Sequence, residues 1–166
     1  MPNNYYYLVA SLTYLRFEDA PPLTGAEFLE ECAKWLTASD LKKLSTVELN
    51  ELAANPEDPA MIKEWKAFNR SLREGLAAAR QAQKESLHEK YPAELKDIFN
   101  EPNPLRMERK FEEKRWNFLE EKETGHHFDL EVLMAYFLKL QIMKRLTAFD
   151  AEKGKIVFEN LCEIKV

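Results

Sequence analysis

The sequence is poor in glycine and has no long uninterrupted apolar run. Its four glycines are scattered along 166 residues, so it contains no glycine-rich phosphate-binding loop. No apolar segment approaches the roughly 20 residues that a membrane-spanning helix requires. The N-terminus also lacks the basic region of a secretory signal peptide. We therefore expect a cytoplasmic protein that does not insert into a membrane.

Cysteine is scarce as well. Cys32 and Cys162 stand alone in apolar, helix-like surroundings, and neither belongs to a CxxC pair. A free cysteine behaves as a small hydrophobic residue. We predict two reduced, buried thiols, and nothing in the sequence supports a disulfide between the two ends of the chain.

Sequence motifs for catalysis, cofactor binding and metal binding are absent. There is no GxSxG motif, and neither cysteine lies beside a histidine in a turn. His126, His127 and Asp129 are the obvious place to look for a metal, but no HExxH or comparable ligand spacing is present. Adjacent side chains also point in different directions. We interpret the histidines as loop and capping residues, and we assign no catalytic, cofactor-binding or metal-binding residue.

The chain is acidic and rich in apolar residues. Its formal net charge is −5, which argues against nucleic acid or an anionic membrane as the main partner. Hydrophobic residues make up 45% of the sequence, enough for a packed core, and charged residues make up 32%. The composition indicates a globular protein with a highly charged surface.

Apolar residues recur mainly at helical spacing, which predicts an all-α, multi-helix bundle. Thr24 and Glu27 form a capping box that opens the first secure helix. Three longer helices are expected over residues 59–89, 104–123 and 129–147. Residues 5–15 fit either a strand or a short helix, and we favour a short helix or an extended segment in the core.

Shorter helices and breaks complete the prediction. Short helices are expected to start at Ser39 or Asp40 and at Ser45 or Thr46, to follow Pro92, and to run from Asp150 to about Leu161. Gly154 in the last of these is expected to mark a close helix–helix approach. The Asn- and Pro-rich residues 100–104 form the clearest linker, so the single domain 1–166 could comprise two lobes, 1–99 and 104–166.

The apolar pattern also predicts how the helices pack. Helices 59–89 and 129–147 should be neighbours that share a core with Phe28, Trp35 and Leu36. The 129–147 helix is apolar on more than one face, which indicates a central position. The second half of the 59–89 helix is rich in alanine. It should either pack closely against a neighbour through small residues or project into solvent.

Two segments contain candidate partner-contact residues. Three consecutive tyrosines cannot all face one core, so at least one of Tyr5, Tyr6 and Tyr7 should be exposed and suited to a protein contact. Residues 106–116 mix basic, acidic and aromatic side chains, with Glu112 able to pair with Arg115. This segment fits a solvated amphipathic helix, a protein-binding helix or a nucleic-acid surface. If it binds protein, Arg109, Arg115 and Trp116 are its candidate contacts.

Segments at both ends of the chain resemble a known protein family. The residues that carry this resemblance are Tyr5-Tyr6-Tyr7-Leu8-Val9-Ala10-Ser11-Leu12, Pro21-Pro22-Leu23, Glu27-Phe28-Leu29-Glu30-Glu31-Cys32, Leu133-Met134-Ala135-Tyr136-Phe137-Leu138-Lys139-Leu140, Arg145, Phe149-Asp150-Ala151-Glu152-Lys153-Gly154, Phe158 and Leu161. They resemble an uncharacterised bacterial family of helical proteins encoded among V-type ATP synthase genes, itself distantly similar to the C (d-type) subunit. Residues 55–125 resemble nothing we can name. The resemblance implies a structural or assembly role, with ATPase stalk or ring subunits as partners. A small helical enzyme or an unrelated cytoplasmic adaptor is the alternative.

Overall fold

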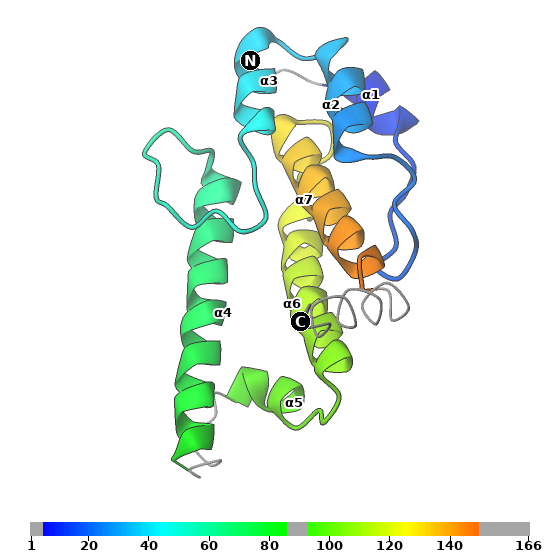
Figure 1. The fold of residues 1–166 in the computed structure, drawn as a ribbon. Coiled ribbons are helices and arrows are strands. Elements are labelled where there is room, and N and C mark those ends of the chain that lie inside the picture. The colour runs from blue at the N-terminus through cyan, green and yellow to red at the C-terminus, as the bar shows by residue number, and fades with distance from the viewer. Residues whose placement is uncertain (1–4, 86–92, 150–166) are drawn as a thin grey trace, which may run out of the picture.

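A computed structural model describes residues 5–85 and 93–149, and within those ranges the chain forms helices and loops with no strand (Figure 1). The elements are, in chain order, α1 (Tyr6–Ser11), α2 (Gly25–Ala33), α3 (Ala38–Ser45), α4 (Ala60–Lys84), the 3-10 helix η2 (Ala93–Leu95), α5 (Lys96–Phe99), α6 (Pro104–Glu123) and α7 (Leu130–Thr147). The all-α prediction is confirmed, and α1 shows that the ambiguous first segment begins as a helix. The predictions for Gly154, for Cys162 and for a helix from Asp150 to about Leu161 lie outside the described residues.

Local capping explains where three helices begin. Glu27 accepts a hydrogen bond from the Thr24 N–H (2.7 Å), and Thr24 Oγ1 accepts one from the Glu27 N–H (3.3 Å), so the capping box is confirmed. Asn103 caps α6 by accepting from the Leu105 N–H at 2.9 Å. Asp129 caps α7 in the same way, accepting from the Val132 N–H at 3.1 Å.

α7 is the central helix, as predicted. It packs against α2, α3 and α6, and nearly every residue from 133 to 143 is buried. The fully buried Phe28 ring of α2 stacks on Tyr136 and Phe137, with ring centroids 5.2 and 5.5 Å apart. A helix enclosed on several faces must be largely apolar, and the one buried charge in α7, Lys139, pairs with Glu123 at 2.6 Å.

The long helix α4 shares its apolar core with α7 and Phe28, as predicted, but the two helices are not close neighbours. α4 packs chiefly on α6 rather than on α7 (Figure 1). Phe68 of α4 stacks on Phe118 of α6 with centroids 4.2 Å apart, and Trp65 lies 5.9 Å from the same ring. The aromatic residues of α6 therefore form the layer between α4 and α7.

The alanine-rich half of α4 packs closely against a neighbour. Ala79 and Ala82 are buried and contact Phe99 of α5. A second apolar cluster, made of Leu72, Leu95, Ile98 and Phe111, joins α4, α5 and α6. Small side chains let the short α5 approach α4, which accounts for the low bulk of that half of the helix. The division into two lobes stays a prediction.

The short helix predicted from Ser45 or Thr46 was wrong, because residues 47–59 form a loop. Side chains from distant helices take the backbone groups that a helix would pair. Gln141 of α7 accepts from the Leu49 N–H (2.9 Å) and donates to the Val47 carbonyl (3.0 Å). The helix before this loop is capped by Thr37, two or three residues before the predicted cap at Ser39 or Asp40.

Candidate protein-binding surface

The three consecutive tyrosines separate into one anchor and two surface residues. Tyr5 is buried, its hydroxyl donates to Asp40 at 2.5 Å, and its backbone N–H donates to the Phe128 carbonyl at 2.6 Å. These bonds fix the start of α1, so the next two side chains point away from the core. Tyr6 is 51% exposed and Tyr7 is 74% exposed, as the sequence led us to expect of at least one of them.

Other aromatic rings, exposed at Trp35 and His127 and half-buried at Phe128, extend this surface. Tyr7 stacks on Trp35, which is 51% exposed, with centroids 6.3 Å apart and an interplanar angle of 27°. Tyr6 lies 4.6 Å from Phe128, whose ring in turn lies 6.3 Å from His127. We define the aromatic surface as Tyr6, Tyr7, Trp35, His127 and Phe128. It joins α1, the end of α2 and the α6–α7 loop, which meet at one end of the molecule (Figure 1).

The prediction that Trp35 belongs to the core was wrong, because its side chain is 51% exposed. α2 ends at Ala33 and the following residues turn. Trp35 therefore leaves the buried face that holds Phe28. Leu36 keeps a partly buried position against the core. The Trp35 indole N–H donates to the Glu31 carboxylate at 3.4 Å, which holds the Trp35 ring beside Tyr7.

His126 is a structural residue of the α7 N-terminus. Its Nδ1 lies 2.6 Å from Asp129 and its Nε2 lies 3.0 Å from Glu131. The pKa of His126 is raised, chiefly by the hydrogen bond to Asp129 and further by the charges of both carboxylates, against an opposing effect of partial burial. This pair holds the capping carboxylate in place. Residues 5–85 and 93–149 contain no cluster of three or more His, Cys, Asp or Glu side chains suited to a metal ion.

The candidates on α6 do not form one surface. Arg109 is exposed, near the α5 end of α6 and away from the aromatic surface. Arg115 and Trp116 are buried inside this chain, where Arg115 pairs with Glu112 and the Trp116 indole donates to Glu120 at 2.9 Å. The predicted solvated face of residues 106–116 was therefore wrong at Glu112 and Arg115. Their i,i+3 pairing is confirmed, with Nη1 and Oε1 3.0 Å apart.

The Cys32 thiol is poorly suited to act as a nucleophile. It is fully buried and free, as predicted. Burial raises the pKa of Cys32 to about 12, so the thiol stays protonated near neutral pH. The thiolate is the nucleophilic form of cysteine, and a buried protonated thiol is poorly suited to catalysis.

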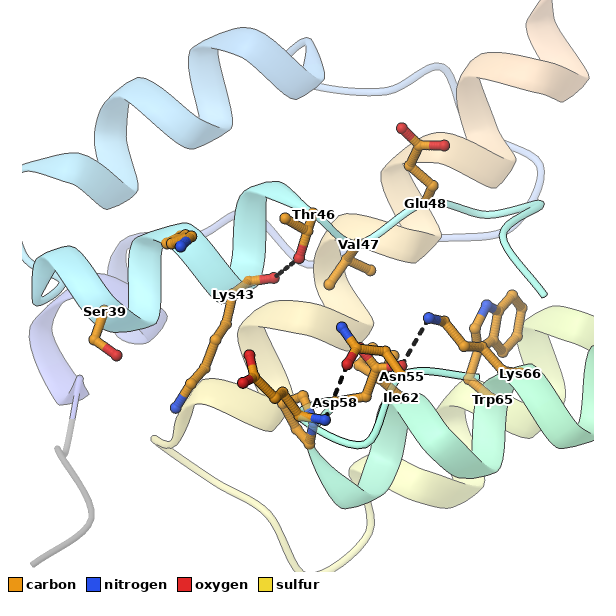
Figure 2. A pocket seen from close by; sticks show the side chains of 13 residues that line it. Ser39, Lys43, Thr46, Val47, Glu48, Asn55, Asp58, Ile62, Trp65 and Lys66 are labelled. Atoms are coloured by element: carbon orange, nitrogen blue, oxygen red, sulfur yellow. Dashed lines mark hydrogen bonds and ion pairs between the residues drawn. The ribbon is translucent and has the colours of Figure 1, made fainter. Parts of the chain in front are cut away.

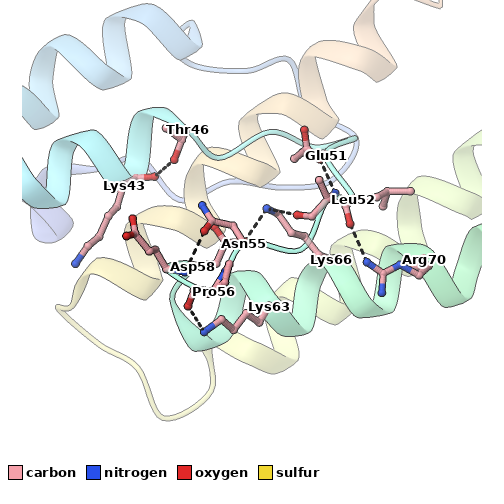
Figure 3. Close-up of polar contacts among 12 residues, drawn as sticks. Lys43, Thr46, Glu51, Leu52, Asn55, Pro56, Asp58, Lys63, Lys66 and Arg70 are labelled. Atoms are coloured by element: carbon pink, nitrogen blue, oxygen red, sulfur yellow. Dashed lines mark hydrogen bonds and ion pairs between the residues drawn. The ribbon is translucent and has the colours of Figure 1, made fainter.

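A polar pocket of about 260 Å³ lies between α3, the 47–59 loop and α4 (Figure 2). Two of its charged residues, Asp58 and Lys66, pair with each other, and α4 side chains beside the pocket bind the loop. Lys66 bridges Asp58 (2.7 Å) and the Ala53 carbonyl (2.9 Å), while Lys63 donates to the Pro56 carbonyl at 2.7 Å (Figure 3). Arg70 donates to the Leu52 carbonyl at 2.8 Å. These α4 side chains fasten the loop, a role that the sequence-based prediction did not identify.

The described part of the chain is all-helical and organised around one central helix, α7. No described helix is both long enough and apolar enough to cross a membrane. The chain belongs to the family described as "Protein of unknown function (DUF2764)", whose profile matches residues 78–165, more than half of its length. No curated protein and no solved structure matches the chain. The matched residues include the C-terminal segment 133–161, on which the resemblance to the V-type ATP synthase-linked family partly rests. They also include part of residues 55–125, which resembled no family that we could name. Residues 5–32 lie outside the match.

Proposed function

We propose that this protein is a non-catalytic binding protein that uses the aromatic surface to contact a protein partner. The observation that carries the proposal is the contiguous exposure of Tyr6 and Tyr7 on α1 and of Trp35 in the turn after α2. The buried Tyr5 fixes the start of α1. Exposed apolar residues scattered singly need no explanation, but rings gathered into one contiguous surface typically mark an interaction site.

The chemistry of these rings suits a protein interface. Tyrosine and tryptophan bring a large apolar area together with a polar atom, and they lose little conformational entropy on binding. They are also enriched among the residues that dominate binding energy. The stack of Tyr7 on Trp35 orders both rings before a partner arrives, which lowers the entropic cost of association.

We further propose that the partner belongs to a V-type ATPase, as one of its stalk or ring subunits. This finer proposal is supported by the resemblance of residues 5–32 and 133–161 to a family encoded among V-type ATP synthase genes. Tyr6, Tyr7 and the helix before Trp35 belong to the first of those stretches. The role would be structural or in assembly, performed in the cytoplasm at the periphery of the membrane complex.

Affinity capture from native membranes tests the proposal. The tagged parent protein should recover ATPase stalk or ring subunits. Combined Tyr7→Ser and Trp35→Ser substitutions should abolish recovery, because both side chains are at least half exposed and their loss leaves the core intact. Tyr14→Ser is the matched control, since Tyr14 is 79% exposed and lies outside the aromatic surface. Recovery of other proteins alone would favour an unrelated adaptor, and recovery unaffected by the double substitution would exclude this surface.

A further inference from the structure

A second hollow, of about 560 Å³, opens among α4, α5, α6 and the end of α7. Four arginines line it, namely Arg73 and Arg80 from α4, Arg115 from α6 and Arg145 from α7. We call it the arginine cleft. Its size lies within the range of roughly 300–1,000 Å³ that is typical of small-molecule sites.

Carboxylates neutralise only two of these charges. Glu112 Oε1 lies 3.0 Å from both Arg115 Nη1 and Arg145 Nε, and Glu108 accepts from Arg145 Nη2 at 3.2 Å. The Arg145 Nε approach is an ion pair without hydrogen-bond geometry, since this nitrogen reaches no acceptor. Both acidic residues are thereby used on the two inner arginines.

The outer two arginines have no counter-charge in the described part of the chain. Arg73 donates to the neutral Asn50 side chain at 3.0 Å, and no ion pair involves Arg80. Four arginines set against two glutamates leave the cleft with a surplus of two positive charges, in a protein whose net charge is −5. This local reversal of sign favours an anion in the cleft.

Arg115 is a buried arginine of the cleft with an unused hydrogen-bond donor. Its side chain is only 2% exposed, its guanidinium lies 4.5 Å from the centre of the Phe111 ring, and its Nε–H finds no acceptor. Buried polar groups are nearly always hydrogen-bonded, and an unused donor on a buried cation is costly. An oxyanion in the cleft would offer acceptors to Arg115 as well as to the outer arginines.

The remaining lining is apolar. Leu76 from α4, Ile98 from α5, and Met107 and Phe111 from α6 complete the cleft. A bare inorganic ion would leave this surface unused. An anionic group attached to an apolar body would contact both halves of the lining.

We propose that the arginine cleft binds a small organic phosphate monoester. Its dianionic phosphate would be held by Arg73, Arg80 and Arg115, and its apolar body would pack against Leu76, Ile98 and Phe111. The surplus of two charges matches the dianion. Guanidinium groups also present paired donors in the geometry that phosphate oxygens accept.

Isothermal titration calorimetry with phenyl phosphate tests this site on the full chain. The parent should bind one equivalent with a dissociation constant below about 1 mM. Arg73→Gln and Arg80→Gln should each weaken binding about tenfold, the effect of one charge-assisted hydrogen-bonding group. Both residues are exposed, so melting temperatures should be unchanged. Arg106→Gln is the control, because Arg106 is exposed, carries the same charge and lies outside the cleft.

Two further probes separate the parts of the ligand. Inorganic phosphate should bind more weakly than phenyl phosphate, and phenol should not bind. Absence of saturable binding of phenyl phosphate up to about 10 mM would overturn the proposal, since that affinity is too weak for a built site. Equal weakening by Arg80→Gln and Arg106→Gln would overturn it too, because it would reveal only a general charge effect. Inorganic phosphate binding as tightly as phenyl phosphate would rule out the apolar half of the site.

Discussion

At the scale of single residues, the most consequential pair is Glu112 and Arg115. Both are buried, and burial raises the pKa of Glu112 while it lowers the pKa of Arg115, although each charge opposes the shift of the other. An ion pair in such a place adds little net stability, but removing one partner leaves an uncompensated buried charge.

Glu112→Gln should therefore destabilise the protein by about 3–5 kcal/mol, the usual cost of breaking a buried ion pair from one side. The measurement is urea denaturation followed by tryptophan fluorescence. Glu113→Gln, at the exposed neighbouring position, should change stability by less than about 0.5 kcal/mol. A Glu112→Gln protein as stable as the parent would mean that the pair is not buried as described.

His126 gives stability a specific pH dependence. Its pKa in the folded protein is raised above the ordinary value of 6.5, first by the hydrogen bond to Asp129. A raised folded pKa means that the protonated form is favoured by folding. The resulting stabilisation is complete below the unfolded pKa and is lost as the pH rises through the folded one.

The difference in unfolding free energy between the parent and His126→Gln should therefore be larger at pH 5.5 than at pH 8.5. The ring is 37% exposed, so solvent screening limits the change to on the order of 0.5 kcal/mol. His127→Gln should show no such difference, because His127 has no carboxylate partner in the described part of the chain. An equal effect of His126→Gln at both pH values would show that the contact with Asp129 does not persist in solution.

At the scale of elements, local signals explain the successful predictions and distant contacts explain the failures. α6 and α7 begin where Asn103 and Asp129 cap them, and both caps are readable from a few neighbouring residues. Gly125, with φ of 94°, follows the end of α6 as expected of a helix stop. The 47–59 loop could not be read in this way, because the Gln141 side chain that holds it is about 90 residues away.

Gln141→Ala should loosen that loop. The substitution removes one acceptor and one donor for the loop backbone, at a cost of about 1–3 kcal/mol. Amide hydrogen exchange should show faster exchange at Leu49, while the amides within α7 stay protected. Gln83→Ala, at an exposed position on α4, should leave Leu49 unchanged. Unaltered exchange at Leu49 in Gln141→Ala would show that other contacts hold the loop.

At the scale of the whole molecule, α7 has the aromatic surface near its start and the arginine cleft near its end. The exposed tyrosines could be predicted from their number alone, because three consecutive rings cannot share one core. Trp35 could not, since its place depends on where α2 stops. The arginine cleft was also unpredictable, because its four arginines come from three helices, and two of them, Arg73 and Arg145, stand 72 positions apart in the sequence.

The main proposal is that Tyr7 and Trp35 bind a stalk or ring subunit of a V-type ATPase. Its most direct test is the equilibrium affinity of the purified protein for isolated ATPase stalk and ring subunits, measured by biolayer interferometry. We expect saturable binding by the parent and by Tyr14→Ser. The affinity of the Tyr7→Ser, Trp35→Ser double variant should be lower by about thirtyfold or more, as expected for hot-spot residues. Equal affinities of the parent and the double variant, or no binding by the parent, would contradict it.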